Sequence, residues 1–245
     1  KSLEKIAISL RIRNEGPYLD EWFQYYIALG FKNFLVYNGP NPTLPDDGTT
    51  DILAFWKEYV PGIEVTHVET SDYETHMKSD HFISLKRKEF RYILLIDIDE
   101  FLVLAEGFDL ETYLEEKWNA TVGCIMIDRF NAVDPVDFFL EKKKNFEIFQ
   151  PTHLYTHTEP DSYKSFAAPD RSVYENSHWS SCFHGFTTCN APRDKIFIIH
   201  LQMRGQLSKA IYTNVKHNRI SGWVNFYRVV GFDNKTYFAN LMQYY

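Results

Sequence analysis

The sequence predicts an α/β fold in which a mostly parallel sheet is flanked by helices. Through residues 5–105, short apolar segments rich in β-branched and aromatic residues alternate with amphipathic segments, which is the pattern of consecutive β–α units. Polar residues follow each apolar segment, and in parallel sheets such positions meet at one edge, where ligands bind. Beyond residue 105 the alternation is less regular.

Four strands are expected in the regular half, and all of them are short and bounded by turn residues. They are expected at Ile6–Leu10, Asn33–Tyr37, Ile63–Val68 and Tyr92–Asp97. The last is an uninterrupted apolar run, which is typical of a strand buried on both faces. The segments that follow the four strands are polar, and three carry carboxylates: Arg11–Glu15, Tyr37–Gly39, Glu69–Asp72 and Asp97–Glu100.

Helices are expected between these strands. Pro17 suits the first turn of a helix, where its missing N–H is no loss, and Gly30 suits the end of the same helix. Apolar residues recur between them at helical spacing on one face. Two further helices are expected at Thr50–Tyr59 and Glu74–Phe90.

The second half predicts fewer regular elements. A helix is expected at Asp109–Trp118, and buried strands are expected at Val122–Asp128 and Ile196–His200. The remaining expectations are half-exposed strands within Phe146–His157, a loop over Phe166–Cys189, and terminal helices at Leu207–His217 and Trp223–Tyr237.

Composition excludes several classes of protein. The net charge is −7 and no long basic stripe is present, which argues against nucleic-acid binding. No apolar run approaches the roughly 20 residues of a membrane span, so a soluble domain, cytoplasmic or in the secretory lumen, is expected. Three cysteines leave one odd, which argues against a disulfide framework. The 20 Phe, 16 Tyr and 5 Trp indicate a bulky core or, alternatively, surfaces that stack on sugar or base rings.

The most informative segment is Arg91–Leu104, a buried strand that runs into the carboxylates Asp97, Asp99 and Glu100. An unpaired buried charge costs several kcal/mol, so these acids require a positive partner. Two carboxylates spaced by two residues can converge on one ion, and hard oxygen ligands favour Mg²⁺ or Mn²⁺. The alternative is a turn or capping cluster without a ligand.

Several short motifs in this half occur together in one known group of enzymes. They are Asp97-Ile-Asp99-Glu100-Phe101-Leu102, Arg13-Asn14-Glu15, Tyr18-Leu19, Glu21-Trp22 and Tyr25-Tyr26. Together they resemble the metal-dependent glycosyltransferases of GT-A fold, in particular the group that contains glycosyltransferase family 92 and related family 2-like enzymes. The likeness covers residues 5–105 and, more loosely, 120–210. It implies one GT-A domain over residues 1–245, with a nucleotide-sugar-binding half at 1–105 and an acceptor half with C-terminal helices at 106–245.

The resemblance also implies roles for individual residues. It places Arg11–Glu15 (with Arg13 and Asn14), Tyr37 and Asn38 around the nucleoside, and Asp97, Ile98 and Asp99 at the ribose and metal. It makes His200 a further metal ligand, and because Mn²⁺ accepts imidazole more readily than Mg²⁺ does, His200 favours Mn²⁺. The donor is expected to be UDP-linked and the acceptor a glycan hydroxyl. Lys78, Lys164 and Arg171 are expected either to contact phosphates or acceptor or to be exposed surface bases.

A catalytic base is needed only if the transfer inverts the anomeric centre, and Asp134 and Asp161 are the candidates. Two other functions remain open at this point. Some phosphohydrolases carry a similar Asp-x-Asp sequence at a strand end, with the first Asp as nucleophile. An aromatic-rich domain could also bind carbohydrate without turnover. Spacing within His178–Cys189 raises a structural zinc site as a weaker alternative.

Overall fold

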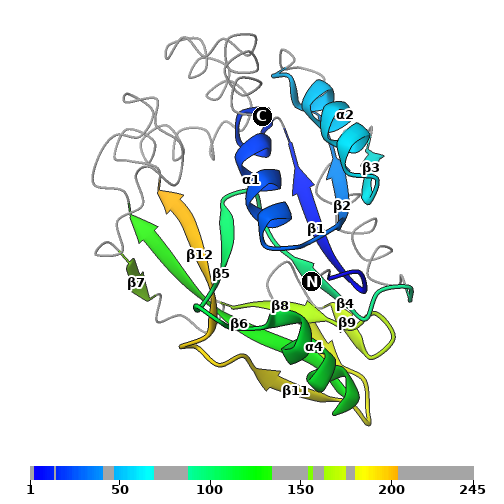
Figure 1. Cartoon of the computed structure of the whole chain (residues 1–245), viewed down its shortest axis with the longest axis vertical. Coiled ribbons are helices and arrows are strands. Elements are labelled where there is room, and N and C mark those ends of the chain that lie inside the picture. The colour runs from blue at the N-terminus through cyan, green and yellow to red at the C-terminus, as the bar shows by residue number, and fades with distance from the viewer. Residues whose placement is uncertain are drawn as a thin grey trace.

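The structure is a computed structural model that describes residues 3–13, 15–40, 47–68, 88–133, 154–156, 163–174 and 180–203. A ten-stranded mixed sheet forms the centre of the described structure, and a few helices pack against it (Figure 1). Its main path runs β3-β2-β1-β4-β8-β6-β12-β5, and β7 and β11 also pair with β6. The predicted α/β class is confirmed.

The four strands of the first half are parallel to one another throughout, as expected. Their bounds are β1 Ile6–Ile12, β2 Asn33–Asn38, β3 Ile63–His67 and β4 Tyr92–Leu95. The register pairs Arg11 with Tyr37 and Ser9 with Leu95. The carboxyl ends of β2, β1 and β4 therefore lie side by side, and this confirms the convergent edge for three of the four predicted polar segments.

Both faces of β1, β2 and β4 are buried, which explains their largely apolar sequences, whereas the edge strand β3 is mostly exposed. Ile8 and Leu10 of β1 face the main core, whereas Ala7 faces a second cluster with Leu35 and Ile93. Three helices of the described chain contribute to the main core: α1 Gly16–Ala28, α2 Thr49–Tyr59 and α4 Leu110–Asn119. All three begin and end within two residues of the predicted helix bounds.

Helix α1 supplies the largest side chains of the main core. Trp22, Phe23 and Tyr26 are fully buried. The Trp22 ring meets Phe23 edge to face at a centroid distance of 5.3 Å, a favourable aromatic geometry, and meets Tyr26 at a tilt at 4.6 Å. Gly30 ends this segment at φ 98°, a left-handed conformation that glycine adopts without steric strain. Much of the aromatic content therefore serves packing.

Parallel and antiparallel pairing are mixed in the second half of the sheet. The long strand β6 Val122–Val133 pairs antiparallel with β8 Tyr163–Ala167 and β7 Leu154–Thr156. It pairs parallel with β11 Thr187–Asn190 and β12 Ile196–Met203. A separate ribbon joins β9 Ser172–Tyr174 to β10 Ser180–Cys182. The strand predicted to end at Asp128 thus continues for five more residues, to Val133, because a second set of partners pairs with it.

Two sequence expectations are wrong. Phe166–Cys189 was expected to be a loop, but its described parts contain β9 and β10 and most of β11. These short strands are poor in apolar residues and form because neighbouring strands satisfy their backbone groups. The strand expected at Tyr92–Asp97 stops at Leu95, and after a turn the chain returns as β5 Glu100–Leu104, which pairs with β12.

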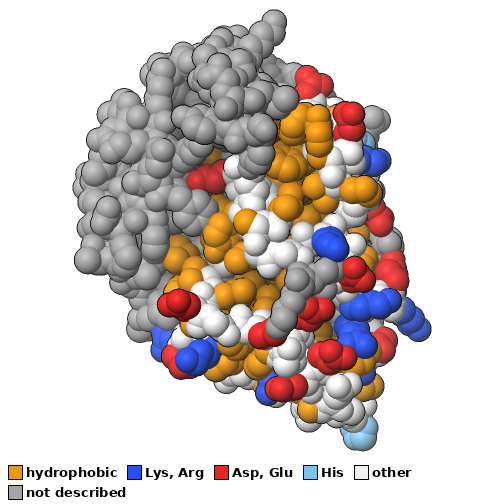
Figure 2. Space-filling view, in the orientation of Figure 1, with side chains coloured by type: hydrophobic (Ala, Val, Ile, Leu, Met, Phe, Trp, Pro, Cys, Tyr) orange, Lys and Arg blue, Asp and Glu red, His pale blue; other side chains and the backbone are white. Residues whose placement is uncertain are grey.

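Three predicted helices cannot be compared in full. Glu74–Phe90 lies outside the described residues except for 88–90, which are not helical, and Leu207–His217 and Trp223–Tyr237 lie wholly outside them. On the face drawn in Figure 2, basic and acidic side chains of the described residues lie interspersed, without a stripe of one sign. In the described part of the chain, no helix combines the length and the apolar character that crossing a membrane requires.

Candidate active site

The candidate site lies at the carboxyl edge of β2, β1 and β4. Arg11 and Tyr37 are paired neighbours at this edge, and Asn38 is the last residue of β2. Asp97 follows β4 by two residues, and Arg11 is near enough to lower its pKa. The structure therefore brings together four of the residues assigned to nucleotide binding.

A tight turn carries the three acids from β4 into β5. The N–H of Glu100 donates to the carbonyl of Asp97 (3.1 Å), and the N–H of Asp97 donates to Oε2 of Glu100 (2.9 Å). Ile98, between the two aspartates, packs into the main core, so its side chain anchors the turn. Asp97 and Asp99 therefore lie on a backbone that is held from both ends.

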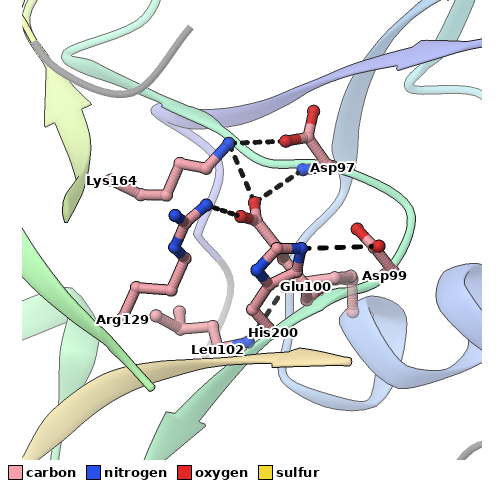
Figure 3. A network of polar contacts seen from close by, with 8 residues as sticks. Asp97, Asp99, Glu100, Leu102, Arg129, Lys164 and His200 are labelled. Carbon is pink, nitrogen blue, oxygen red and sulfur yellow. Dashed lines mark hydrogen bonds and ion pairs between the residues drawn. The ribbon is translucent and has the colours of Figure 1, made fainter. Parts of the chain in front are cut away.

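Glu100 is completely buried and has two cationic partners (Figure 3). Its Oε2 lies 3.0 Å from Lys164 Nζ, and its Oε1 lies 2.9 Å from an Arg129 guanidinium nitrogen. Lys164, from β8, is also fully buried, and its Nζ lies 2.7 Å from Asp97 Oδ2. A divalent cation was expected to be the positive partner of these acids, but Lys164 and Arg129 compensate Glu100 and Asp97.

Lys164 and Asp97 favour each other's charged form. Burial favours the neutral form of Lys164, but Asp97 and Glu100 outweigh this effect and raise its pKa. Burial likewise raises the pKa of Asp97, but the positive charges of Lys164 and Arg11 outweigh it and hold that pKa below the ordinary value. Asp97 is therefore an ionised carboxylate, and about a third of its side chain is exposed (34%).

Asp99 has a different neighbour. Strand β12 pairs antiparallel with β5, so that His200 lies opposite Glu100, and its Nε2 is 3.5 Å from Asp99 Oδ2. Burial lowers the pKa of His200, but the Asp99 carboxylate outweighs burial and raises it. Figure 3 shows Asp97 directed to Lys164 and Asp99 directed to His200. The two aspartates of the motif thus contact different side chains, Lys164 and His200.

A metal ion at this site would need several donor side chains close together. In the residues that the structure describes, no group of three or more His, Cys, Asp and Glu side chains could hold a metal. Asp99 and His200 nevertheless supply two donor atoms 3.5 Å apart, close to the separation of about 3 Å between neighbouring ligands of an octahedral ion. Asp99 and His200 could therefore supply two of the ligands of a metal ion, whereas Asp97 already contacts Lys164.

Two tyrosines of α1 fix the start of β5. The Tyr26 hydroxyl donates to the carbonyl of Glu100 (3.0 Å) and accepts from the N–H of Leu102 (3.1 Å). The Tyr25 hydroxyl donates to the carbonyl of Leu102 (2.6 Å). Tyr25-Tyr26 belongs to the motifs that carry the family resemblance, and its structural task is to position the strand that holds Glu100.

The loop between β1 and α1 is held by carboxylates. Glu15 accepts a hydrogen bond from the N–H of Arg13 (3.4 Å). Asp47 accepts from the N–H of Gly16 (3.0 Å) and from both the N–H and the hydroxyl of Thr49 (3.1 and 2.6 Å). Asp47 thereby ties together the first residues of α1 and α2. A Cβ at Gly16 would lie 2.7 Å from the Asp47 carbonyl oxygen, so this approach requires glycine.

Several predicted residues cannot be placed. Asn14, Lys78, Asp134, Asp161 and His178 lie outside the described residues. Arg171 is described, and its guanidinium stacks on Trp118 at 3.4 Å and donates to the Trp118 carbonyl (2.7 Å). Arg171 therefore packs on Trp118 with only 12% of its side chain accessible, and the alternative that it is an exposed surface base is wrong. The same correction holds for Lys164.

Sequence reasoning missed the buried ion network of Glu100, Lys164 and Arg129. One signal was present: Glu100 opens the apolar stretch Phe101–Leu104, and an acid that begins a buried strand requires a cation from elsewhere. No local pattern identified Lys164 as that cation, because it is 67 positions from Asp97 along the chain.

Comparison with protein-family models gives no match, and comparison with curated proteins gives none either. Among solved structures, the chain is similar to Staphylococcus aureus TarS 1-349 in complex with UDP (15% identity, TM-score 0.37, 62% of this chain and 46% of that one). It is also similar to the mannosyltransferase PcManGT from Pyrobaculum calidifontis in complex with GDP-Man and Mn²⁺ (12% identity, TM-score 0.39, 91% and 69%). The chain thus spans less than half of the TarS chain.

Proposed function

We propose that this chain is a metal-dependent glycosyltransferase of GT-A type. It would transfer a sugar from a nucleotide sugar, UDP-linked, to a hydroxyl of a glycan acceptor, with residues 1–245 acting as one domain. The observation that carries the proposal is the pairing of Asp99 with His200, at 3.5 Å, beside the ionised Asp97. A carboxylate and an imidazole at the carboxyl edge of a parallel sheet suit a nucleotide-bound cation.

In this proposal Asp99 and His200 hold the metal, and the imidazole favours Mn²⁺ over Mg²⁺. The ion would stabilise the negative charge that develops on the diphosphate as the bond to the sugar breaks. His200 binds a metal only as the neutral imidazole. The proton that Asp99 favours on His200 must therefore leave when the metal binds.

Asp97 has a different role. Lys164 binds its Oδ2 and keeps it charged, and a fixed carboxylate is a strong acceptor for a ribose hydroxyl or for a water on the metal. Lys164 is thus a positioning residue: it is completely buried, and it orients a group that contacts the nucleotide.

The nucleoside would lie along the neighbouring strand ends. Arg11, Arg13 and Tyr37 are described at this edge, and Ile98 offers only its backbone. Asn38 is fully buried, and both polar atoms of its side-chain amide lack a hydrogen-bond partner within the described residues. An unsatisfied buried amide is unfavourable, so a ligand that pairs with Asn38 would gain affinity.

The remaining assignments rest on the sequence resemblance. Asn14 and Glu15 would complete the loop after β1, and Lys78 would act as a point charge on the phosphates. If the transfer inverts the anomeric centre, Asp134 or Asp161 would take the proton of the acceptor hydroxyl. A transfer with retention needs no such base.

Thermal stabilisation by nucleotide sugars tests the proposal. UDP-, GDP- and dTDP-sugars are compared with and without Mn²⁺, and the UDP-sugar with Mn²⁺ is expected to raise Tm most. Asp99→Ala should remove the metal-dependent part of this shift. Asp194→Ala, at an exposed carboxylate whose side chain is 76% accessible, should retain it. An equal shift in both variants would refute the metal assignment.

Two further assays separate the two other functions. Turnover of a simple phosphate ester without a sugar donor would indicate the phosphohydrolase. Glycan binding that is unchanged in EDTA, with no stabilisation by any nucleotide sugar, would indicate a binding domain without turnover.

A further inference from the structure

Two cysteines lie sulfur to sulfur in a part of the molecule that the proposed reaction does not use. Cys124 is the third residue of β6 and is fully buried, whereas Cys182 is the last residue of β10 and is partly exposed. Their sulfur atoms are 2.7 Å apart although the residues are 58 positions apart in the chain. Cys124 lies five positions before Arg129 on the same strand, away from the site.

The backbone around the pair brings the two sulfurs together. Gly123 has no side chain, and a Cβ placed there would lie only 2.9 Å from the Cys182 sulfur. The N–H of Phe183, next to Cys182, donates to the carbonyl of Arg171 (2.9 Å), and Arg171 is itself fixed on Trp118. The ribbon of β9 and β10 is therefore held with Cys182 against β6.

Strand alternation decides which two of the three cysteines pair. Thr188 of β11 lies opposite Cys124 in the register with β6, and its hydroxyl is 3.2 Å from the Cys182 sulfur. Side chains alternate along a strand, so the next residue, Cys189, faces the other side, toward Tyr113 of α4. The odd cysteine is thus separated from the pair by the sheet.

We propose that Cys124 and Cys182 form a disulfide bond that joins the β9–β10 ribbon to the main sheet. The composition alone argued against a disulfide framework, but the geometry selects one pair and leaves Cys189 as a thiol. The proposal does not depend on the glycosyltransferase activity, because it concerns only these sulfurs and their strands.

The chemistry is a thiol–disulfide exchange with an external disulfide oxidant, either a small molecule or a protein. The thiolate of Cys182, which is the more exposed, attacks one sulfur of the oxidant and releases a thiolate. The Cys124 thiolate then attacks the Cys182 sulfur and releases the second thiolate. The two cysteines lose two protons and two electrons, and the oxidant is reduced to two thiols.

Closing a long loop lowers the conformational entropy of the unfolded chain. For a chain of this size, the cross-link is expected to raise Tm by roughly 5–15 °C. Reduction should reverse this shift, and it should loosen the ribbon of β9 and β10 first.

The test counts thiols in the 245-residue chain after equilibration with oxidised glutathione, using alkylation under denaturing conditions and mass spectrometry. We expect one alkylated cysteine, Cys189, and a cross-linked peptide that joins Cys124 to Cys182. Dithiothreitol should yield three alkylated cysteines and lower Tm. Three free thiols after oxidation, or a cross-link through Cys189 or between two chains, would overturn the proposal.

Two variants complete the test. Cys182→Ser should remove both the cross-link and the effect of dithiothreitol on Tm, and the partly exposed position of Cys182 limits damage to the core. Cys189→Ala, the matched control, should retain both. If dithiothreitol lowers Tm equally in Cys182→Ser and in the unaltered chain, the pair is not cross-linked.

Discussion

Lys164 reaches Asp97 from the strand next to β4, and its ammonium lies 2.7 Å from the Asp97 carboxylate with no exposed surface of its own. The same ammonium lies 3.0 Å from Glu100. One lysine thus contacts both the partly exposed Asp97 of the proposed nucleotide site and the buried Glu100 that begins β5. This contact makes the position of Asp97 depend on the packing of the second half of the sheet.

Replacing Lys164 by Met should destabilise the fold strongly. It would leave Glu100 buried with one partner fewer, and breaking a buried ion pair on one side typically costs about 3–5 kcal/mol. Urea unfolding measures the loss. Lys32→Met is the matched control, because Lys32 and Glu4 form an exposed pair (57% and 72% accessible), which contributes less than about 1 kcal/mol. Equal losses in the two variants would contradict the buried network.

Replacing His200 by Ala should lower the affinity for Mn²⁺ by at least about tenfold. Loss of a residue that merely hydrogen-bonds a metal ligand typically lowers metal affinity by about 10–100-fold, and His200 is proposed to bind the metal directly. The reason is that Asp99 would lose the neighbour that completes its pair of donors. Isothermal titration with Mn²⁺ in the presence of UDP measures the change. His184→Ala, at an exposed position in the turn before β11, should leave the titration unaltered, and an unaltered titration of His200→Ala would move the ligand elsewhere.

Replacing Asn38 by Leu should have opposite effects on stability and on binding. The buried amide has no partner within the described residues, so removing it should be neutral or stabilising for the free protein, while UDP affinity should fall. Asn33→Leu, at the other end of β2, should destabilise, because Asn33 donates to the carbonyls of Glu4 and Ile6 (3.0 and 3.1 Å). Chemical unfolding and UDP titration distinguish the two, and a stable Asn38→Leu variant with unchanged UDP affinity would remove Asn38 from the site.

Replacing Asp20 by Asn should stabilise the protein at neutral pH. Burial raises the pKa of Asp20 above its ordinary value although Oδ1 accepts a hydrogen bond from the Trp56 indole N–H (2.7 Å). The folded state therefore disfavours the charged form. This unfavourable contribution is absent below the unfolded pKa, near 3.8, and grows as pH rises toward the folded pKa.

Unfolding of the unaltered chain and of Asp20→Asn, measured across pH, gives the sign directly. The variant should be more stable by roughly 1–3 kcal/mol at pH 7, and the difference should shrink as pH falls toward 3.8. A difference that grows on acidification would mean that Asp20 is stabilised in its charged form.

Local patterns predicted the regular part of this fold well. The strands that begin at Ile6 and Asn33 and the helices that begin near Pro17 and Thr50 were expected within one or two residues, because each is defined by periodicity within a short window. The same patterns missed β9, β10 and β11, whose sequences are hardly apolar. Such strands form only when a neighbour such as β6 supplies hydrogen-bond partners.

By itself, the sequence determined the alternation of strands and helices, the polar edge where β1, β2 and β4 end, and the placement of Asp97 and Asp99 at that edge. Only the tertiary structure decided which basic side chain each acid meets: Lys164 for Asp97 and His200 for Asp99. These partners come from β8 and β12, which join the sheet through pairings between distant parts of the chain. Each of these ion pairs joins side chains from strands that are far apart in the sequence. A pattern within a short stretch of sequence therefore cannot predict them.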